Sequence, residues 1–385
     1  MHKELTLGID AHNIRAGGGI THLSEMLAAA DPEKFGFKKV IVWSGNNTLQ
    51  QLPHRKWLTL QSHSYLNKSI FYRLFWLFFI RNRELRKEQC DILFVPGGTD
   101  CLIMKPMVTM NQNLLPFEFQ EAKRYGLGLK LIKFIILRLI QSYTFRKAQG
   151  ILFLTNYAQV TVKKVTGPLN GLSTIVPHGI HPKFFRKPEE KVYQSFQSFT
   201  RENPCKLIYV SVVEIYKHQW QVIRGVKILR DKGYHVELEL IGPPGPGMPF
   251  LDQAIAELKG DVSWVNYQGM KPYDQIQNHY SIADIGIFAS SCETYGQIVS
   301  EAMSASLPMA CSNLSAMKDV IGEYAVYFHP EKPSEIADAL KKLMESAELR
   351  KFNAENAFEI AKKLTWQSSA DLSFSFFKNV YQSFK

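Results

Sequence analysis

Residues 283–303, ADIGIFASSCETYGQIVSEAM, contain the clearest structural signal in the chain. An apolar run that ends near Ala289 predicts a buried strand, and a helix is expected to begin near Gly296. Glu293 falls in the loop between them, and Glu301 falls more than one turn inside the helix. A strand, a short loop and a helix in this order form the unit from which parallel α/β sheets are built.

Strands and helices alternate along the rest of the chain in the same way. Besides 284–288, we expect strands at 5–9, 39–43, 91–95, 107–110, 150–154, 173–176, 206–211, 235–241, 262–265, 307–310 and 325–328. Helices are expected between most of them, for example at 20–30, 219–232 and 251–259. Because strands separated by helices form parallel sheets with helices on both faces, the predicted fold class is α/β.

The alternation stops in the polar stretch 182–204 and then restarts, which predicts two doubly wound, Rossmann-like domains. We expect a first domain at 1–180, a linker at 181–204, a second domain at 205–365 and a C-terminal helix at 366–385 that packs back on the first domain. Ligands of such sheets bind beyond the carboxyl ends of the strands, so two such domains predict a deep cleft between them.

The composition supports a globular protein. The 385 residues are 45% hydrophobic and 21% charged, which provides for two cores and excludes a disordered or fibrous chain. The scattered cysteines have no paired spacing, so neither a zinc site nor a disulfide framework is expected. These cysteines are Cys90, Cys101, Cys205, Cys292 and Cys311. The start lacks the apolar core of a secretion signal, and the longest apolar run, 74–80, is too short to span a membrane. We therefore expect a soluble, cytoplasmic protein.

The positive charge is concentrated in the first half. Residues 1–200 contain 27 Lys and Arg against 13 Asp and Glu, a balance of +14, whereas residues 201–385 contain 19 against 22, a balance of −3. Such a field attracts phosphates of a nucleic acid, a membrane lipid or a lipid-linked diphosphate, and a solubilising basic surface is the alternative. Because no nucleic-acid recognition motif accompanies the charge, a nucleic-acid partner is not expected.

The start of the helix near Gly296 suits a diphosphate. The backbone N–H groups around Gly296, Gln297 and Ile298 are the unpaired donors of a helix start, and glycine lets an anion approach closely. Carboxylates accept hydrogen bonds from hydroxyls, so Glu293 could hold a transferred sugar and Glu301 a ribose. The alternative is that Glu301 is a solvated helix residue and Glu293 a charge favoured by the helix dipole.

The stretch 284–330 resembles the nucleotide-sugar-binding segment of retaining glycosyltransferases of family 4, the glycosyl transferases group 1, which have the two-domain GT-B fold. The family pattern has two glutamates separated by seven residues and followed by "EAM", a small residue, "P", a strand and a closing "P". The matching positions here are Glu293, Glu301-Ala302-Met303, Ser306, Pro308 and His329-Pro330. The resemblance extends weakly over the whole chain.

This resemblance implies a retaining, metal-independent hexosyltransferase with no cofactor. Its donor would be a nucleotide-diphosphate sugar, and its acceptor a polysaccharide or lipid-linked oligosaccharide of cell-surface glycan or lipopolysaccharide synthesis. The domain at 1–180 would be the acceptor side, and the domain at 205–365 the nucleotide-sugar side.

The resemblance also assigns donor-binding positions. These are Gly18, Gly19, Ser211, Lys217, Glu293, Tyr295, Gly296, Gln297, Ile298 and Glu301. Lys217 matches the family's phosphate-binding lysine, but Val212 stands near the place of the usual arginine. His218, Arg224 or a residue of the first half would have to substitute for it.

The family's histidine beside the sugar is also absent. Asn111, Gln112 and Asn113 stand in its loop, on the acceptor side, and a neutral amide cannot act as a base. Asp100 and Glu118 are the nearest carboxylates for an acceptor hydroxyl, so the catalytic candidates are Glu293 and Asp100. Leaving-phosphate charge would be stabilised by helix N–H groups and Lys217, while a nucleophilic Glu293 is the rival path.

Two segments of the first half, 65–86 and 127–146, mix apolar and basic residues. This pattern is typical of an interfacial helix, and equally of a buried helix with charged ends. With the balance of +14, it favours peripheral contact with an anionic membrane, on the inner face of the cytoplasmic membrane. Two other functions stay open: a nucleotide-sugar epimerase of the same fold, and a non-catalytic protein that binds sugar nucleotides.

Overall fold

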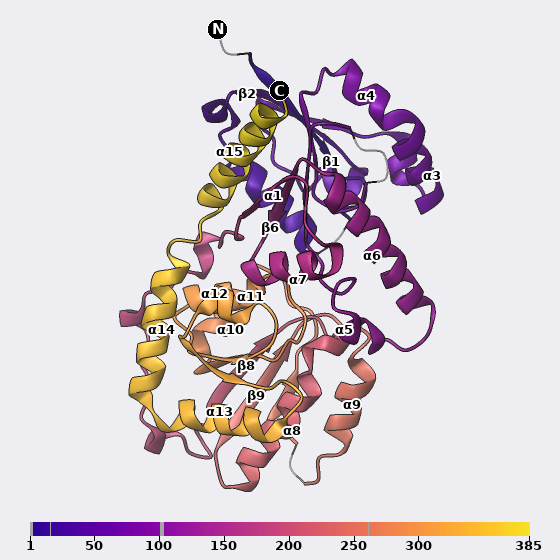
Figure 1. Cartoon of the computed structure of the whole chain (residues 1–385). Coiled ribbons are helices and arrows are strands. Elements are labelled where there is room, and N and C mark those ends of the chain that lie inside the picture. The colour runs from indigo at the N-terminus through magenta and orange to yellow at the C-terminus, as the bar shows by residue number, and fades with distance from the viewer. Residues whose placement is uncertain (1–2, 16, 101–103, 261) are drawn as a thin grey trace. The chain divides into compact units, whose positions relative to one another are not determined.

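The structure is a computed structural model that describes residues 3–15, 17–100, 104–260 and 262–385. The chain divides into two compact units, whose elements are labelled in Figure 1. Unit 1 consists of Met1–Phe119, Leu127–Gly179 and Thr365–Lys385, and unit 2 consists of Gln120–Gly126 and Ile180–Leu364. Cys101 lies outside the described residues, and the other four cysteines are free thiols.

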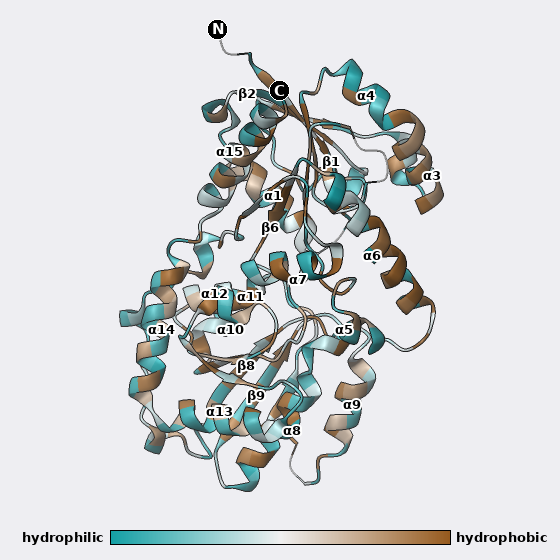
Figure 2. Ribbon diagram, in the orientation of Figure 1, coloured by the Kyte–Doolittle hydropathy of each residue, from teal (hydrophilic) through white to brown (hydrophobic). Residues whose placement is uncertain are grey.

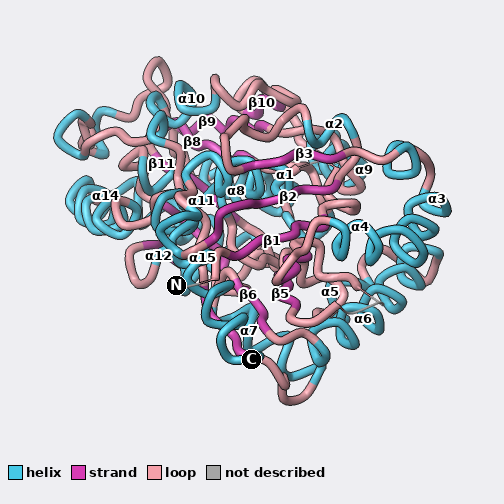
Figure 3. Tube along the Cα trace, turned by 90° about the horizontal axis from the view of Figure 1, so that it is seen from above, coloured by secondary structure: helices cyan, strands magenta, loops and turns pink. Residues whose placement is uncertain are grey.

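Unit 1 is built on a seven-stranded parallel sheet with the order β3-β2-β1-β4-β5-β6-β7. Its strands are β1 (Leu5–Asp10), β2 (Phe37–Trp43), β3 (Leu58–Gln61), β4 (Ile92–Val95), β5 (Met107–Met110), β6 (Gly150–Phe153) and β7 (Leu172–Ile175). Figure 3 shows β3, β2 and β1 side by side. The strands β4, β5 and β6 are buried at every position, as expected of parallel strands that are covered on both faces.

The helices of unit 1 connect these strands. They are α1 (Gly18–Ala29), α2 (Asn46–Leu49), α3 (Ile70–Phe75), α4 (Arg81–Lys87), α6 (Leu129–Lys147), α7 (Asn156–Thr166) and α15 (Trp366–Phe384), while α5 (Phe119–Lys123) begins at the edge of the unit. Between α3 and α4 the chain continues as one π-helical turn, η3 (Trp76–Ile80), and short 3-10 turns form at η1 (Pro32–Phe35) and η2 (Ser64–Asn67). The C-terminal helix α15 packs on α1, and the Thr365 hydroxyl caps it by accepting the Ser368 N–H.

Unit 2 is built on a six-stranded parallel sheet with the order β10-β9-β8-β11-β12-β13. Its strands are β8 (Cys205–Val210), β9 (Val236–Ile241), β10 (Val265–Tyr267), β11 (Ile285–Phe288), β12 (Met309–Ser312) and β13 (Ala325–Phe328). The helices are α8 (Gln219–Asp231), α9 (Met248–Ala256), α10 (Ile276–Ile282), α11 (Gln297–Ser304), α12 (Met317–Ile321), α13 (Pro333–Glu345) and α14 (Ala347–Ala361). Short 3-10 turns form at η4 (Pro182–Phe184), η5 (Pro188–Glu190), η6 (Phe196–Ser198) and η7 (Ile215–Lys217).

The predicted fold class, two doubly wound parallel α/β domains, is confirmed. Eleven of the twelve predicted strands agree with observed strands to within two residues at each end, β5 and β13 without any shift. The strand β3 was not predicted, and β10 shares only Val265 with the prediction of 262–265. Both lie at the edge of a sheet, where half-buried positions carry a weak apolar signal.

The observed units also differ in detail from a simple division of the sequence. The residues expected to form a linker, 181–204, group with unit 2, and Thr365–Lys385 groups with unit 1. The heptapeptide Gln120–Gly126 groups with unit 2 although unit 1 residues flank it on both sides. None of the described helices is long and apolar enough to cross a bilayer.

Candidate active site

The candidate site of unit 2 lies where the strand order of its sheet reverses. The chain passes from β8 to β9 on one side, and β11 pairs with β8 on the other. At such a point the loops that follow the two strands diverge, and ligands bind there beyond the carboxyl ends. Lys217 ends the turn η7 after β8, and Glu293 lies in the loop after β11.

Lys217 and Glu293 form an ion pair through Nζ and Oε1. Their side chains are 9% and 14% exposed, so the pair is mostly buried but not sealed. The Lys217 ammonium also lies 4.6 Å from the centre of the Phe288 ring, a cation–π contact. The structure therefore brings together the sequence-predicted lysine and the first predicted glutamate.

Serine side chains hold the Glu293 loop. The Ser290 hydroxyl donates to Glu293 Oε1 at 2.6 Å. Ser315, which follows β12, accepts the Glu293 N–H at 2.5 Å and donates to the Glu293 carbonyl at 3.0 Å. Ser290 thus orients the Glu293 carboxylate and Ser315 fixes its backbone, and a substrate-binding group needs such a fixed position.

The helix α11 begins beside this loop. Its N-cap, Gly296, has a φ of 90°, and no described side chain caps the helix. A Cβ at Gly296 would lie 2.7 Å from Met317 Cε. Both the positive φ and this close contact therefore require glycine at position 296. The side chain of the preceding Tyr295 is buried and bonds to Ser300 at 3.1 Å, so it points into the core and not toward a donor. Gln297 and Ile298 contribute the first backbone N–H groups of α11.

Glu301 is buried inside α11. Tyr273 donates its hydroxyl to Glu301 Oε1 at 2.9 Å, while Oε2 is buried without a hydrogen-bond partner among the described residues. Burial raises the pKa of Glu301 to about 7, against the opposing effects of the Tyr273 hydroxyl and the Lys183 charge. A buried carboxylate oxygen with no partner is costly unless a hydroxyl from a ligand completes it.

The loops after β8 and β9 pack against each other. The Ser211 hydroxyl donates to the Val212 carbonyl at 2.8 Å. A Cβ at Gly242, where φ is 150°, would lie 1.9 Å from the Ser211 carbonyl oxygen. The glycine at position 242 therefore allows a close approach of two backbones, and Ser211 is held by the backbone and not by a charged group.

The heptapeptide Gln120–Gly126 brings an arginine to the segment that follows β13. Arg124 binds both carboxylate oxygens of Glu331, at 2.9 Å through Nη1 and 2.5 Å through Nη2, and contacts Glu121 at 2.8 Å. The Tyr125 hydroxyl donates to Glu214 at 2.6 Å. Sequence analysis left open which residue replaces the arginine absent near Val212, and Arg124, a residue of the first half, is joined to unit 2 by these bonds.

His218 and Arg224 were the other two candidates for the missing arginine, and each has different contacts from Arg124. His218 contacts the Ser291 hydroxyl at 2.9 Å, and burial, aided by the Arg124 charge, lowers its pKa to about 4. It is therefore uncharged near neutral pH. Arg224 pairs with Glu257 on the exposed surface of α8.

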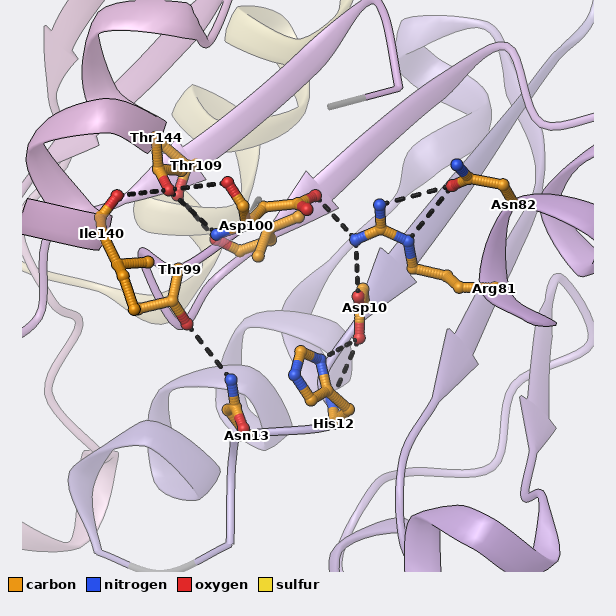
Figure 4. Close-up of polar contacts among 11 residues, drawn as sticks. Asp10, His12, Asn13, Arg81, Asn82, Thr99, Asp100, Thr109, Ile140 and Thr144 are labelled. Atoms are coloured by element: carbon orange, nitrogen blue, oxygen red, sulfur yellow. Dashed lines mark hydrogen bonds and ion pairs between the residues drawn. The ribbon is translucent and has the colours of Figure 1, made fainter. Parts of the chain in front are cut away.

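Unit 1 carries a closed ionic cluster at its own strand reversal, between β1 and β4 (Figure 4). Arg81 Nη1 donates to Asp10 at 3.1 Å and to Asp100 at 2.6 Å, and all three side chains are 0% exposed. Asp100 is held further through its backbone N–H, which donates to the Thr144 hydroxyl at 2.9 Å. Asp100 is thus paired with Arg81 and bonded to Thr144 of α6, and these contacts fit a structural role. Sequence reasoning had no signal for Arg81.

His12 follows β1 next to this cluster. Its Nδ1 lies 2.7 Å from Asp10 Oδ1, and its backbone N–H also bonds to that oxygen (Figure 4). Burial alone would raise the pKa of Asp10, but the charges of His12 and Arg81 lower it to about 2. A histidine oriented by an ionised carboxylate is a recurring arrangement for contacting a reacting hydroxyl. The spacing Asp10-Ala11-His12 at the end of a strand was its only sequence signal.

The remaining acceptor-side residues follow β5. Asn111 is buried and donates to the Asn113 carbonyl at 3.1 Å, while Asn113 Oδ1 accepts the Leu115 N–H at 3.0 Å. Gln112 approaches the glycine loop, because a Cβ at Gly19 would lie 3.2 Å from Gln112 Oε1. The neighbouring Gly18 begins α1 and is exposed. Of the site residues predicted in unit 1, Gly19 and Gln112 therefore lie close together in the structure.

Known proteins match part of this chain at low sequence identity. O-antigen chain mannosyltransferase B of Escherichia coli is 23% identical over 115 residues, which is 30% of this chain and 30% of that protein. The match therefore spans less than a third of that relative's length.

Solved structures resemble the whole chain. Sucrose-phosphate synthase from Thermosynechococcus elongatus matches with a TM-score of 0.77 at 14% identity, over 98% of this chain and all of that one. HepE of Anabaena, in complex with UDP-glucose, matches with a TM-score of 0.69 at 14% identity, over 98% and 99% of the two chains. At this identity the likeness shows the fold alone. Residues 192–360 match the family described as Glycosyl transferases group 1, and the two parallel α/β units have the GT-B fold of the solved structures.

Proposed function

We propose that this chain is a retaining, metal-independent glycosyltransferase that moves a sugar from a nucleotide-diphosphate sugar to a glycan or lipid-linked acceptor of cell-surface polysaccharide or lipopolysaccharide synthesis. One observation carries the proposal: Lys217 and Glu293 meet at the strand reversal of unit 2, beside the uncapped start of α11. The family match of residues 192–360 supports the same reading. The mannosyltransferase relative acts on an O-antigen chain by its name, and HepE binds UDP-glucose, which supports this acceptor and donor class.

In the proposed mechanism, unit 2 holds the donor. The first N–H groups of α11 and the Lys217 ammonium bind the diphosphate and stabilise the charge that develops on it as the sugar leaves. Glu293 accepts hydrogen bonds from the sugar hydroxyls, and the buried Oε2 of Glu301 accepts one from the ribose. The leaving phosphate then takes the proton of the acceptor hydroxyl on the same face of the sugar. Arg124 is the proposed substitute for the absent arginine, exchanging Glu331 for phosphate.

Unit 1 holds the acceptor in this proposal. Asp100 is committed to Arg81, so we assign contact with the acceptor hydroxyl to His12, which Asp10 orients. The chain would act in the cytoplasm, with peripheral contact at the inner face of the membrane.

A thermal-shift panel of UDP-, GDP-, ADP-, CMP- and dTDP-sugars tests the donor class, because a ligand that binds the folded state raises its stability. We expect one nucleotide to raise the melting temperature, and Lys217→Met to remove that shift. Incubation with the selected donor and a lipid-linked glycan should then yield a new glycosidic product with the donor's anomeric configuration. Donor conversion without a glycosidic product would instead identify an epimerase, and binding without turnover a non-catalytic binder.

A further inference from the structure

The helical stretch that begins at α3 carries an apolar face into solvent. Phe71 and Phe79 are 78% and 70% exposed, and Phe75 between them is also exposed. Their spacing of four residues aligns them along one side of the stretch. A helix of a globular protein normally turns such a face to the core, and contiguous exposed apolar surface marks an interaction site. Figure 2 shows α3 and most of α6 in the colours of hydrophobic residues.

The α6 helix repeats this feature within unit 1. Leu129 is 85% exposed, and Ile132, Ile136 and Leu139 on the same helix are exposed as well. The Thr144 hydroxyl near its end bonds to Asp100, which pairs with Arg81 at the start of α4. The buried cluster therefore holds α6 and the start of α4, which continues the helical stretch of α3, at the same strand reversal.

The other side of α3 carries an arginine without a counter-charge. Arg73 Nη1 donates to the His12 carbonyl at 3.4 Å, and its Nε is buried with no hydrogen-bond partner among the described residues. Arg15, in the loop after β1, donates through Nη2 to the Leu66 carbonyl at 3.0 Å. Neither arginine forms an ion pair with a described carboxylate, whereas the neighbouring Arg81 has two.

The two guanidinium groups also act on each other. Burial lowers the pKa of Arg73, and the positive charge of Arg15 lowers it further. Arg15 is exposed and Arg73 is half-buried, and both lie at the loop that follows β1. An anion from outside would relieve the repulsion of these two like charges. Arginine binds phosphate through paired N–H donors, and the Nε–H of Arg73 has no partner among the described residues.

We propose that Arg15 and Arg73 bind the phosphate of a lipid-linked acceptor whose hydrocarbon chain lies along the exposed apolar face of α3. An anion site at the inner side of an exposed aromatic face fits an amphiphile with one phosphate next to its chain. This deepens the proposed function, on whose acceptor class it rests. It also accounts for an apolar face that sits directly beside the loop of His12.

Vesicle co-sedimentation of the full chain tests the proposal. The probes are phosphatidylcholine vesicles, the same vesicles doped with a polyprenyl monophosphate, and vesicles in which phosphatidylglycerol supplies an equal charge. We expect the wild-type protein to prefer the polyprenyl phosphate over phosphatidylglycerol by about tenfold, as charge-assisted hydrogen bonds suggest. The double variant R15Q/R73Q should lose this preference.

The matched control is R83Q/R86Q, which removes two exposed arginines of α4 and changes the net charge equally. It should keep the preference for polyprenyl phosphate. Equal losses in both double variants, or equal binding to both anionic lipids, would leave only a general basic surface and overturn the proposal. Phe71→Ser with Phe79→Ser should weaken binding to every polyprenyl-phosphate vesicle without changing the melting temperature.

A donor titration separates this proposal from the proposed function. If R15Q/R73Q keeps the vesicle preference but loses the thermal shift by the nucleotide sugar, the arginines serve the donor diphosphate and the lipid proposal is wrong. If the wild-type protein shows no nucleotide-sugar shift but R15Q/R73Q still abolishes the vesicle preference, the proposed transferase function fails while the phosphate site stands. The single variant R15Q changes an exposed position and should fold normally, so it tests the phosphate site even if the double variant does not fold.

Discussion

Each of the two sheets places a cation between its diverging loops, but the two cations have different surroundings. In unit 1, Arg81 is sealed between Asp10 and Asp100, and the three side chains are fully buried. In unit 2, Lys217 has Glu293 as its carboxylate partner and keeps a small opening to solvent. A ligand cannot reach a fully buried ion pair, so such a pair can only stabilise the fold. A partly open pair can replace its internal partner by a substrate.

The largest effect expected from this difference is on activity. Glu293→Gln removes the charge that binds the sugar and balances Lys217, so transfer should fall by about 10²- to 10³-fold, as for loss of one preorganised electrostatic contact. The melting temperature should stay close to that of the wild type. Product formation from the donor selected above is the measurement. Glu323→Gln, at an exposed position of the same unit, is the control, and equal rates for both variants would contradict the assignment.

The second test applies the same idea to unit 1. Arg81→Met leaves the buried Asp100 without its cation and Asp10 with His12 alone, which should lower the free energy of unfolding by about 3–5 kcal/mol. Denaturant unfolding measures the loss. The triple variant R81M/D10N/D100N should recover part of it, because it removes the unpaired charges as well. Lys217→Met should lower the free energy of unfolding by less, because its partner Glu293 retains contact with water. An equal loss in both variants would show that the two ion pairs do not differ in this way.

A buried histidine pair of unit 1 gives a third, smaller effect. His22 Nδ1 lies 2.9 Å from His178 Nδ1, burial lowers the pKa of His22 to about 4, and the pKa of His178 is lowered as well. The folded state thus keeps these imidazoles neutral, whereas the unfolded chain protonates them below about pH 6.5. Their contribution to stability is present above that pH and is lost as the pH falls toward about 4, by about 3 kcal/mol for His22 alone.

Unfolding free energies at about pH 7 and pH 4.5 measure this loss. His22→Phe should flatten the dependence, and His54→Gln, at an exposed position, should leave it unchanged. A wild-type profile that is flat over this range would show that the pair is protonated or open in the folded protein.

The smallest effect concerns Glu301 in unit 2. Its pKa of about 7 means that the carboxylate is half protonated at neutral pH, and the ionised form is the one that accepts the ribose hydroxyl at Oε2. Donor affinity should therefore fall by about tenfold for each pH unit below 7. Calorimetric titration with the selected nucleotide sugar follows this slope. Glu301→Gln should bind more weakly at about pH 8 and show a flat profile; a wild-type profile without slope would exclude ribose contact with this oxygen.

The comparison of the two units also explains what the sequence could predict. Most strands of both sheets were predictable because parallel strands that are buried on both faces have continuous apolar sequences, as β5 shows. Glu293 and Glu301 were found because their contacts are local to one strand, loop and helix. Their actual partners, Ser315 and Tyr273, lie more than twenty residues away and left no pattern.

The site features that the sequence did not predict depend on charges that pair over long distances in the chain. Arg81 stands 71 residues from Asp10 in the chain, and single charges at such distances have no spacing to recognise. The exposed face of α3 illustrates another limit: the mixture of basic and apolar residues in 65–86 fitted a buried and an interfacial helix equally well. Only the folded chain shows which side of that helix meets solvent.

The grouping of Gln120–Gly126 with unit 2 has a practical consequence for protein engineering. The polypeptide changes units four times, at 119/120, 126/127, 179/180 and 364/365, so neither unit is encoded by one uninterrupted stretch of the gene. A fragment limited to 180–364 would strip Glu214, Ser291 and Glu331 of the bonds that the heptapeptide supplies. Anyone cutting out a stand-alone nucleotide sensor from this chain must graft those seven residues back.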